Sequence, residues 1–165
     1  MANFSFDIVS EYDKAEMNNV FDQVKREIAT RYDFKGTPAQ LEWLDSNKDG
    51  FIITSNSEYQ IDAIIEIIRK KLSIRGLSQK ILDTSQKLIL ANLKTTKNIP
   101  FKRGLSQDDT KKITKLLKDE LPKIKTQIQG ETIRVTSPKK DELQIAMQLI
   151  NNADFDFPHN FVNFK

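Results

Sequence analysis

The chain has 165 residues, of which 38% are hydrophobic and 30% charged, and this composition predicts a folded, soluble protein of one domain or two small ones. The absence of cysteine excludes disulfides, thiolate metal sites and cysteine nucleophiles, and the single histidine, His159, excludes a multi-histidine metal cluster. No apolar run approaches the roughly 20 residues of a membrane span, and the N-terminus lacks signal-peptide features, so we expect a cytoplasmic protein without membrane association.

The net charge of +3 is unevenly distributed along the chain. Residues 69–125 hold 16 basic and 5 acidic side chains, a local excess of +11. Such a segment favours a polyanionic partner, such as a nucleic acid, a nucleotide or a phosphate-rich surface. A solvated lysine-rich surface that serves solubility is the competing interpretation, and the charge count leaves both open.

The first forty residues predict a strand followed by an amphipathic helix. Apolar and polar residues alternate over residues 4–8, which is the period of a strand with one buried face. Ser10, with Asp13 three residues later, is a predicted helix cap. The helix ends before Gly36, and its predicted core positions are Ala15, Val20, Val24 and Ile28.

A hairpin and a second helix follow. Residues 39–43 and 51–55 predict two strands joined at Asn47–Gly50, where Asp-Gly tolerates positive φ. Ser57 and Gln60 predict a capping box. The helix that they open has a strongly apolar face made of Ile61, Ile64, Ile65, Ile68 and Leu72, and it stops at Gly76.

Residues 77–105 are harder to interpret. Lys87–Lys97 has the pattern of one strand, whereas Ile81 and Leu82 are compatible with either strand or loop. After this segment, Ser106 and Asp109 predict the start of a helix that Pro122 closes.

The stretch 124–150 is the clearest local unit of the chain. Residues 124–129 and 133–136 alternate as two strands, and the chain reverses near Gly130. Ser137 is the predicted N-cap of a following helix, with Pro138 at its first position. The chain then reaches a last short strand, which is surrounded by Phe155, Phe157, Phe161 and Phe164.

This unit repeats an earlier one. Residues 51–68 align with residues 133–150 at a constant offset, so that Thr54-Ser55 corresponds to Thr136-Ser137. An internal duplication predicts an α+β fold of two ferredoxin-like (βαββαβ) domains, each with an antiparallel sheet and its helices on one face. A chance match between residues that commonly cap helices is the competing explanation.

The sequence offers little support for catalysis. His159 has no triad-like context, and no Walker loop or dinucleotide-binding motif is present. The acidic pairs Asp108–Asp109 and Asp141–Glu142 lie in first helical turns, where the helix dipole already explains them. We therefore expect no enzyme, no cofactor and no metal site.

Basic residues beside structural junctions are better candidates. Arg134, Thr136, Ser137 and Lys139 flank a strand-to-helix junction, where free N–H groups favour phosphate. Lys94, Lys97, Lys102, Arg103 and Lys125 extend a positive surface around it. Arg31 and Lys35 flank Tyr32 and Phe34 in a second basic-aromatic cluster, although a helix end also explains these cations.

Several separated motifs together resemble the YajQ family of small bacterial proteins. They are residues 5–10 (SFDIVS), 31–35 (RYDFK), 127–130 (QIQG), 133–136 (IRVT), 141–144 (DELQ) and 161–164 (FVNF). The resemblance implies two ferredoxin-like domains that have exchanged strands: residues 11–97, and residues 1–10 with 98–165. It also implies binding of nucleotides or nucleic acid without enzymatic activity, with some relatives acting as cyclic di-GMP receptors in transcription.

Two functional hypotheses follow. The first is a non-enzymatic protein that binds RNA or a nucleotide such as cyclic di-GMP and has a regulatory role. The second is a protein–protein adaptor whose basic face and Phe-rich C-terminus dock an acidic or regulatory partner. The sequence leaves the identity of the ligand and the oligomeric state open.

Overall fold

The computed structural model describes residues 3–165 and divides into two compact units. The N-terminal unit is Tyr12–Lys102, and the C-terminal unit combines Met1–Glu11 with Arg103–Lys165. Each unit contains one four-stranded antiparallel sheet and two α-helices. The predicted α+β fold of two ferredoxin-like domains is confirmed.

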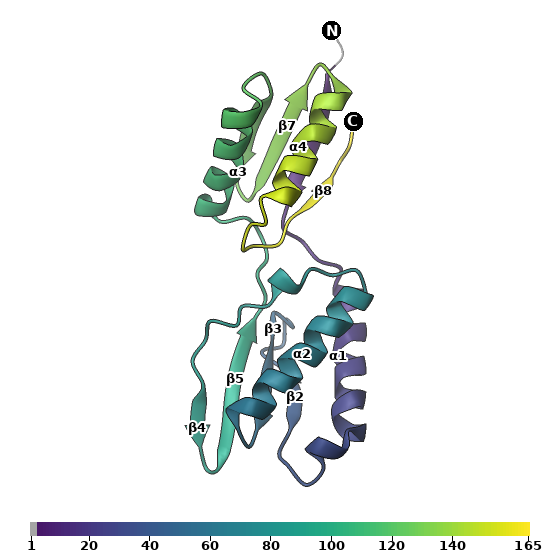
Figure 1. The fold of residues 1–165 in the computed structure, drawn as a ribbon, viewed down its shortest axis with the longest axis vertical. Coiled ribbons are helices and arrows are strands. Elements are labelled where there is room, and N and C mark those ends of the chain that lie inside the picture. The colour runs from purple at the N-terminus through teal and green to yellow at the C-terminus, as the bar shows by residue number, and fades with distance from the viewer. Residues whose placement is uncertain (1–2) are drawn as a thin grey trace. The chain divides into compact units, whose positions relative to one another are not determined.

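The sheet of the N-terminal unit has the strand order β2-β3-β5-β4 (Figure 1). Its elements are α1 (Lys14–Thr30), β2 (Gln40–Trp43), β3 (Gly50–Ser55), α2 (Glu58–Ile74), β4 (Ile89–Ala91) and β5 (Lys94–Pro100), with 3₁₀ turns at Tyr32–Phe34 and Gln79–Ile81. The isoleucine-rich face predicted for α2 packs against Phe51 and Ile53 of β3 in one buried cluster. This packing buries the apolar side of the sheet and holds both helices on that side.

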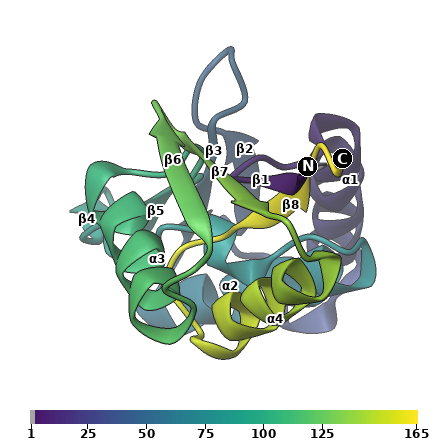
Figure 2. The same cartoon turned by 90° about the horizontal axis from the view of Figure 1, so that it is seen from above.

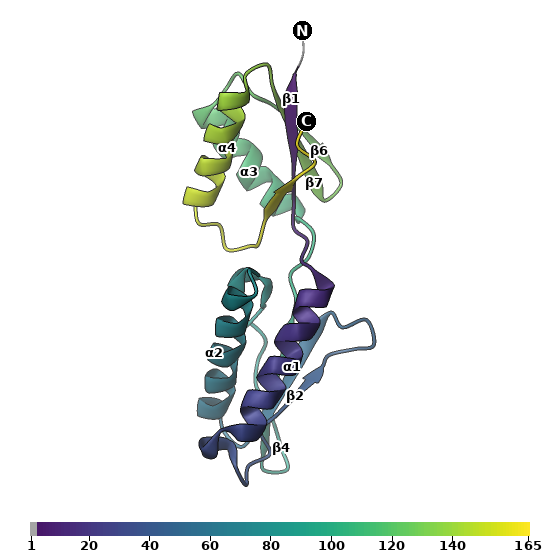
Figure 3. The same ribbon diagram turned by 90° about the vertical axis from the view of Figure 1, so that its right-hand side faces the viewer.

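The sheet of the C-terminal unit has the order β6-β7-β1-β8, and α3 and α4 lie together on one side of it (Figures 2 and 3). Its elements are β1 (Phe4–Val9), α3 (Gln107–Glu120), β6 (Lys125–Gln129), β7 (Thr132–Ser137), α4 (Lys140–Asn152) and β8 (Asn160–Val162). β1 pairs antiparallel with both β7 and β8. The domain limits at residues 10 and 97 and the exchange of strands stay predictions.

Two features of the N-terminal region differ from the sequence-based expectation. The cap of α1 is Asp13, whose carboxylate accepts the N–H groups of Ala15 and Glu16, whereas Ser10 is buried. The helix therefore starts later than predicted: Ala15 is exposed, and Met17 takes its place in the core. In the β2–β3 turn, positive φ occurs at Lys48, not at Gly50. A Cβ at Gly50 would lie 2.7 Å from the Ile99 carbonyl oxygen, so close backbone packing explains this glycine.

Lys87–Lys97 is not a single strand. Asn92 and Leu93, with φ of 52° and 64°, reverse the chain and separate β4 from β5. Ile81 ends the second 3₁₀ turn, and Leu82 forms an isolated bridge with Phe101. The prediction failed because all three residues of β4 are exposed, so this strand has no buried face to reveal the break.

The start of α4 also differs from the prediction. The N-cap residue is Lys139, which makes no side-chain cap bond, and the helix begins at Lys140 after Pro138. Ser137 is the last residue of β7, and its hydroxyl accepts the Lys139 N–H at 3.1 Å and donates to Glu142 at 3.0 Å. The predicted Ser57 cap of α2 is confirmed, but the capping box with Gln60 does not form, because the Gln60 side chain accepts the Asn56 N–H instead of the Ser57 N–H. The predicted Ser106 cap of α3 is confirmed, and Asp109 completes a capping box there.

No helix within the described residues 3–165 is long and apolar enough to cross a membrane.

Candidate functional site

The predicted binding residues are divided between the two units. Those of the N-terminal unit are Arg31, Lys35, Lys94, Lys97 and Lys102. Those of the C-terminal unit are Arg103, Lys125, Arg134, Thr136, Ser137 and Lys139. We therefore consider each unit by itself.

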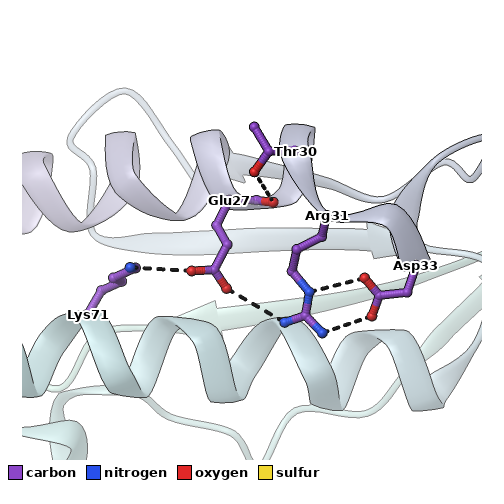
Figure 4. A network of polar contacts seen from close by, with 5 residues as sticks. All are labelled: Glu27, Thr30, Arg31, Asp33 and Lys71. Carbon is purple, nitrogen blue, oxygen red and sulfur yellow. Dashed lines mark hydrogen bonds and ion pairs between the residues drawn. The ribbon is translucent and has the colours of Figure 1, made fainter.

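Arg31 is engaged in an intramolecular network (Figure 4). Its guanidinium lies 2.8 Å from the Asp33 carboxylate and 3.6 Å from that of Glu27, which also pairs with Lys71 at 3.3 Å. It also lies over the ring of Phe34. The hydrogen bond from Arg31 lowers the pKa of Asp33 below its ordinary value. Arg31 thus joins the end of α1 to the 3₁₀ turn, and its charge is already compensated.

The lysines of β5 do not share a face. Lys97 is the cross-strand partner of the buried Ile53, so its side chain lies on the helix-covered side of the sheet. Lys94 lies three residues earlier, on the open side. Lys102 lies beyond the end of β5, where its N–H donates to the Ile81 carbonyl. Lys35 is exposed beside a shallow cavity under Phe34. The structure does not bring these lysines together.

The open face of the C-terminal sheet does bring three predicted residues together. Lys125 of β6 is the cross-strand partner of Thr136 in β7, and Arg134 lies two residues before Thr136 on the same face. The Arg134 Nε donates to the Asp7 Oδ1 at 3.1 Å, and Asn163 donates to the other oxygen of Asp7 at 2.9 Å. Arg134 is therefore neutralised by a nearly buried carboxylate of β1.

The Asp7 carboxylate accepts two side-chain hydrogen bonds on this face, from Arg134 and from Asn163. The hydrogen bond from Arg134 lowers the pKa of Asp7, and the hydrogen bond from Asn163 acts in the same direction against the opposing effect of burial. Asp7 thus stays ionised and fixes Arg134 across the β1–β7 ladder. Arg103, the other predicted arginine of this unit, pairs with Glu11 at 2.7 Å.

The junction between β7 and α4 offers a less compensated positive site. Lys139 and Lys140 are both exposed, and neither forms an ion pair within the described part of the chain. The first-turn N–H groups of α4 donate to no capping side chain at Lys139, because an ammonium group has no acceptor atom. Asp141 and Glu142 in the same turn oppose an anion, but Glu142 accepts the Ser137 hydroxyl. The predicted Ser137 itself is buried, and its hydroxyl is engaged by the Lys139 N–H and by Glu142.

A groove of about 480 Å³ lies beside this junction, and we call it the α4 groove. Its lining residues are Phe4, Ser5, Lys140, Leu143, Gln144, Met147, Phe164 and Lys165. Phe4 is the cross-strand partner of Ser137, so the groove adjoins the end of β7. Its C-terminal wall is held by two backbone hydrogen bonds between Ser5 and Lys165, each 3.0 Å long.

The groove combines three kinds of group that suit a nucleotide. Phe164 is 62% exposed and presents an aromatic face, while Leu143 and Met147 supply an apolar side wall. Lys140 and Lys165 supply positive charge for phosphate, with the N-terminus of α4 close to Lys140. Volumes of 300–1,000 Å³ are typical of small-ligand sites.

Sequence reasoning missed most of these groove residues. Leu143 and Met147 recur at helical spacing and were predicted to face the core; Leu143 is buried there and Met147 packs against it, so their part in a groove gave no separate signal. Phe4 and Phe164 lie 160 positions apart, and no local pattern brings them together. The missing information is the pairing of β1 with the C-terminal segment.

Other candidate chemistry is absent from the described residues. Among residues 3–165, no group of three or more His, Cys, Asp or Glu side chains is placed to hold a metal. His159 lies 2.9 Å from the Asn151 side-chain oxygen and near the Phe161 ring. Phe161 packs edge-on against Phe6, and Phe157 is buried, so much of the Phe-rich C-terminus serves packing.

Comparison with known proteins identifies the family. Residues 4–165 match the family model described as nucleotide-binding protein YajQ-like. The chain belongs to the YajQ family. A nucleotide-binding protein of Prochlorococcus marinus subsp. pastoris is 46% identical over 152 residues, which cover 92% of this chain and 90% of that protein. The nucleotide-binding proteins of Mycolicibacterium gilvum and Thermobifida fusca are 43% and 40% identical and cover 100% and 99% of both chains.

The family assignment confirms the resemblance predicted from the separated motifs. The RYDFK motif of this YajQ-family chain builds the Arg31 network, and the SFDIVS and IRVT motifs supply Asp7 and Arg134 of the central ladder. These motifs therefore have clear structural roles in the folded chain. Half of the residues that line the α4 groove also belong to these motifs, namely Ser5, Leu143, Gln144 and Phe164.

Proposed function

We propose that this YajQ-family protein is a non-enzymatic nucleotide-binding protein and that the α4 groove holds the nucleotide. The observation that carries the proposal is the meeting of an exposed aromatic ring with two lysines in one groove of about 480 Å³. The names of the relatives support the same class of ligand.

The proposed arrangement follows from the chemistry of the lining. A base stacks on Phe164 and contacts Met147 and Leu143, and Gln144 hydrogen-bonds an edge of the base. The phosphate contacts Lys140 beside the N-terminus of α4, where Lys139 adds a second cation. This use of Lys139 keeps one of the residues predicted from sequence.

We further propose that the physiological ligand is RNA or a cyclic dinucleotide such as cyclic di-GMP, and that binding is regulatory. Two lysines in one groove suit a ligand with more than one phosphate. The lining contains no His, Cys, Asp or Glu side chain, the commonest nucleophiles and general bases, which supports binding without turnover.

Isothermal titration with GTP, cyclic di-GMP and a short RNA at low salt tests this proposal. We expect Lys140→Gln to weaken binding about tenfold or more, because a hydrogen bond to a charged group contributes about 1.5–3 kcal/mol. Phe164→Ala removes a stacking contact of about 1–3 kcal/mol. Lys70→Gln, which removes an exposed lysine of α2 in the other unit, is the control and should leave affinity unchanged.

Two results would contradict the binding part of the proposal, and a third would contradict the non-enzymatic part. One is the absence of binding to all three ligands by the unmodified protein at low salt. The other is equal affinity of the Lys140→Gln and Phe164→Ala variants and the unmodified protein, which would place the ligand elsewhere. Recovery of hydrolysed nucleotide after incubation, in proportion to protein concentration, would contradict the non-enzymatic part.

A further inference from the structure

A second groove lies on another part of the C-terminal unit, between α3 and β6. It has a volume of about 460 Å³ and is lined by Lys111, Thr114, Lys115, Lys118, Pro122, Ile124 and Thr126. It shares no lining residue with the α4 groove. We call Lys111, Lys115 and Lys118 the lysine row.

The lysine row is a continuous positive surface. Its members are spaced i, i+4 and i+7 along α3, so they lie on one helix face, and all three are exposed. None of them forms an ion pair in the described part of the chain, whereas the neighbouring Lys112 lies 3.9 Å from Asp156. The acidic residues of α3 are confined to its two ends, at Asp108–Asp109 and Asp119–Glu120.

The rest of the groove is suited to an extended ligand. Ile124, which is 8% exposed, and Pro122 supply apolar surface, and Thr114 and Thr126 supply hydroxyls. β6 is an edge strand with a neighbour on one side only, so its outer backbone N–H groups are available as donors. The exposed Lys125 continues the positive charge onto the open face of the sheet.

The length of the lysine row decides between ligands. With a rise of 1.5 Å per residue, the seven steps from Lys111 to Lys118 span about 10 Å. A stacked strand of nucleic acid passes roughly three phosphates over that length, at about 3.4 Å each. A nucleoside monophosphate has only one phosphate and cannot place one beside each lysine of the row, whereas a polynucleotide can. Lysines serve as point charges for phosphate without base selectivity.

We propose that the lysine row binds successive phosphates of single-stranded nucleic acid. This inference rests on the proposed nucleotide-binding function and adds a second, sequence-independent contact surface to it. The α4 groove then recognises one nucleotide, and the lysine row holds the phosphate backbone of a longer strand.

The test compares an eight-residue oligouridylate with uridine monophosphate at several salt concentrations. For the oligonucleotide, the logarithm of the affinity should fall with the logarithm of salt at about −0.7 per phosphate contacted. In Lys115→Gln/Lys118→Gln this slope should become shallower by about 1.4, and affinity at low salt should fall at least tenfold. The affinity for uridine monophosphate should stay unchanged.

Lys112→Gln is the matched control, because it removes one lysine of α3 that lies outside the groove. The circular-dichroism spectrum of each variant should match that of the unmodified protein, since the side chains of Lys112, Lys115 and Lys118 are exposed. Lys118→Arg keeps the charge and should retain the slope, which separates charge from local helix effects.

An unchanged oligonucleotide slope in Lys115→Gln/Lys118→Gln overturns the inference and leaves the nucleotide proposal standing. Equal competition by polyglutamate of the same length overturns it as well, in favour of an acidic protein segment. If uridine monophosphate and other nucleotides fail to bind but the oligonucleotide slope changes as expected, the α4-groove proposal fails and the lysine row stands.

Discussion

The two sheets have matching strand orders, yet equivalent positions carry different side chains. In the C-terminal sheet, Arg134 of β7 pairs with Asp7 of β1, whereas the matching ladder position of the N-terminal sheet pairs Ile52 with Asn98. One residue earlier, the buried Phe6 corresponds to Lys97.

The helices that follow the equivalent strands show the same contrast. Ser55 and Ser137 are both buried, and each hydroxyl accepts the N–H group two residues later. The residue that donates this N–H is the capping Ser57 in one unit and Lys139 in the other. The turn with its buried serine is thus structural in both units, and the C-terminal unit has a cation where the N-terminal unit has a capping hydroxyl. The same backbone therefore supports a helix start with a side-chain cap and one without.

The largest expected difference in stability is between a variant at Phe6 and a variant at its counterpart, Lys97. Phe6→Ala should lower the free energy of unfolding of the C-terminal unit by about 3–5 kcal/mol, because it opens a cavity among Val135 and Phe161. Lys97→Ala should change the stability of the N-terminal unit by no more than about 0.5 kcal/mol.

Urea unfolding followed by two probes checks this prediction. Trp43 is the only tryptophan and packs on Phe21 and Phe51, so its fluorescence reports on the N-terminal unit. Circular dichroism follows the helices and strands of both units. A Phe6→Ala variant with an unchanged circular-dichroism transition would contradict the assignment of Phe6 to the C-terminal core.

An intermediate effect is expected for the charged pair of the open face. Asp7→Asn should cost about 1.5–3 kcal/mol at neutral pH, because it removes the acceptor charge facing Arg134. Asn98→Ala, at the corresponding position, should fall within about 0.5 kcal/mol of the unmodified protein.

The pH dependence of this pair has a defined sign. The pKa of Asp7 is lowered in the folded protein, chiefly by the hydrogen bond from Arg134, so its stabilisation is complete above about pH 4–5, where an unfolded Asp is ionised. It is lost as the pH falls through the lowered pKa. The stability difference between the unmodified protein and Asp7→Asn should therefore shrink in acid. A difference that is constant with pH would rule out this role for the Asp7 charge.

The smallest effect concerns the two helix starts. Lys139→Ser should stabilise the C-terminal unit by about 1 kcal/mol by supplying the cap that Ser57 supplies to α2. The same change should weaken nucleotide binding about two- to fivefold, since it removes a cation and occupies a first-turn N–H group. Titration calorimetry and thermal unfolding measure the two effects. Higher stability together with tighter binding would show that this helix start does not receive the ligand.

The strands and helices that have one buried face could be predicted from local sequence patterns. Phe6 and Ile8 of β1 and Ile133 and Val135 of β7 alternate with polar residues, because packing on one face imposes the period of a strand. The matching Thr54-Ser55 and Thr136-Ser137 pairs indicated two similar units. Elements without a buried face gave no such signal, as β4 illustrates. Ser137 was misplaced as a cap because a serine that bonds the N–H two residues later looks the same in sequence.

The candidate site was only partly predictable. Lys139 could be proposed from sequence because a cation beside a strand-to-helix junction is a local feature, and its role in binding stays a prediction. The aromatic wall of the α4 groove depends on the hydrogen-bonded pairing of Ser5 with Lys165, which joins distant parts of the chain. Charge compensation is equally non-local: Arg134 looked available until β1 placed Asp7 against it.

The position of β1 also constrains the order in which the protein folds during synthesis. Ile8 pairs with Ile133, so 125 residues separate a strand from its partner in β7. At a translation rate of about 5–20 residues per second, the ribosome needs roughly 6–25 s to deliver that partner. The N-terminal unit is complete in the interval, whereas the apolar strand with Phe6 and Ile8 waits unpaired. Newly made β1 is therefore the segment on which a chaperone would act first.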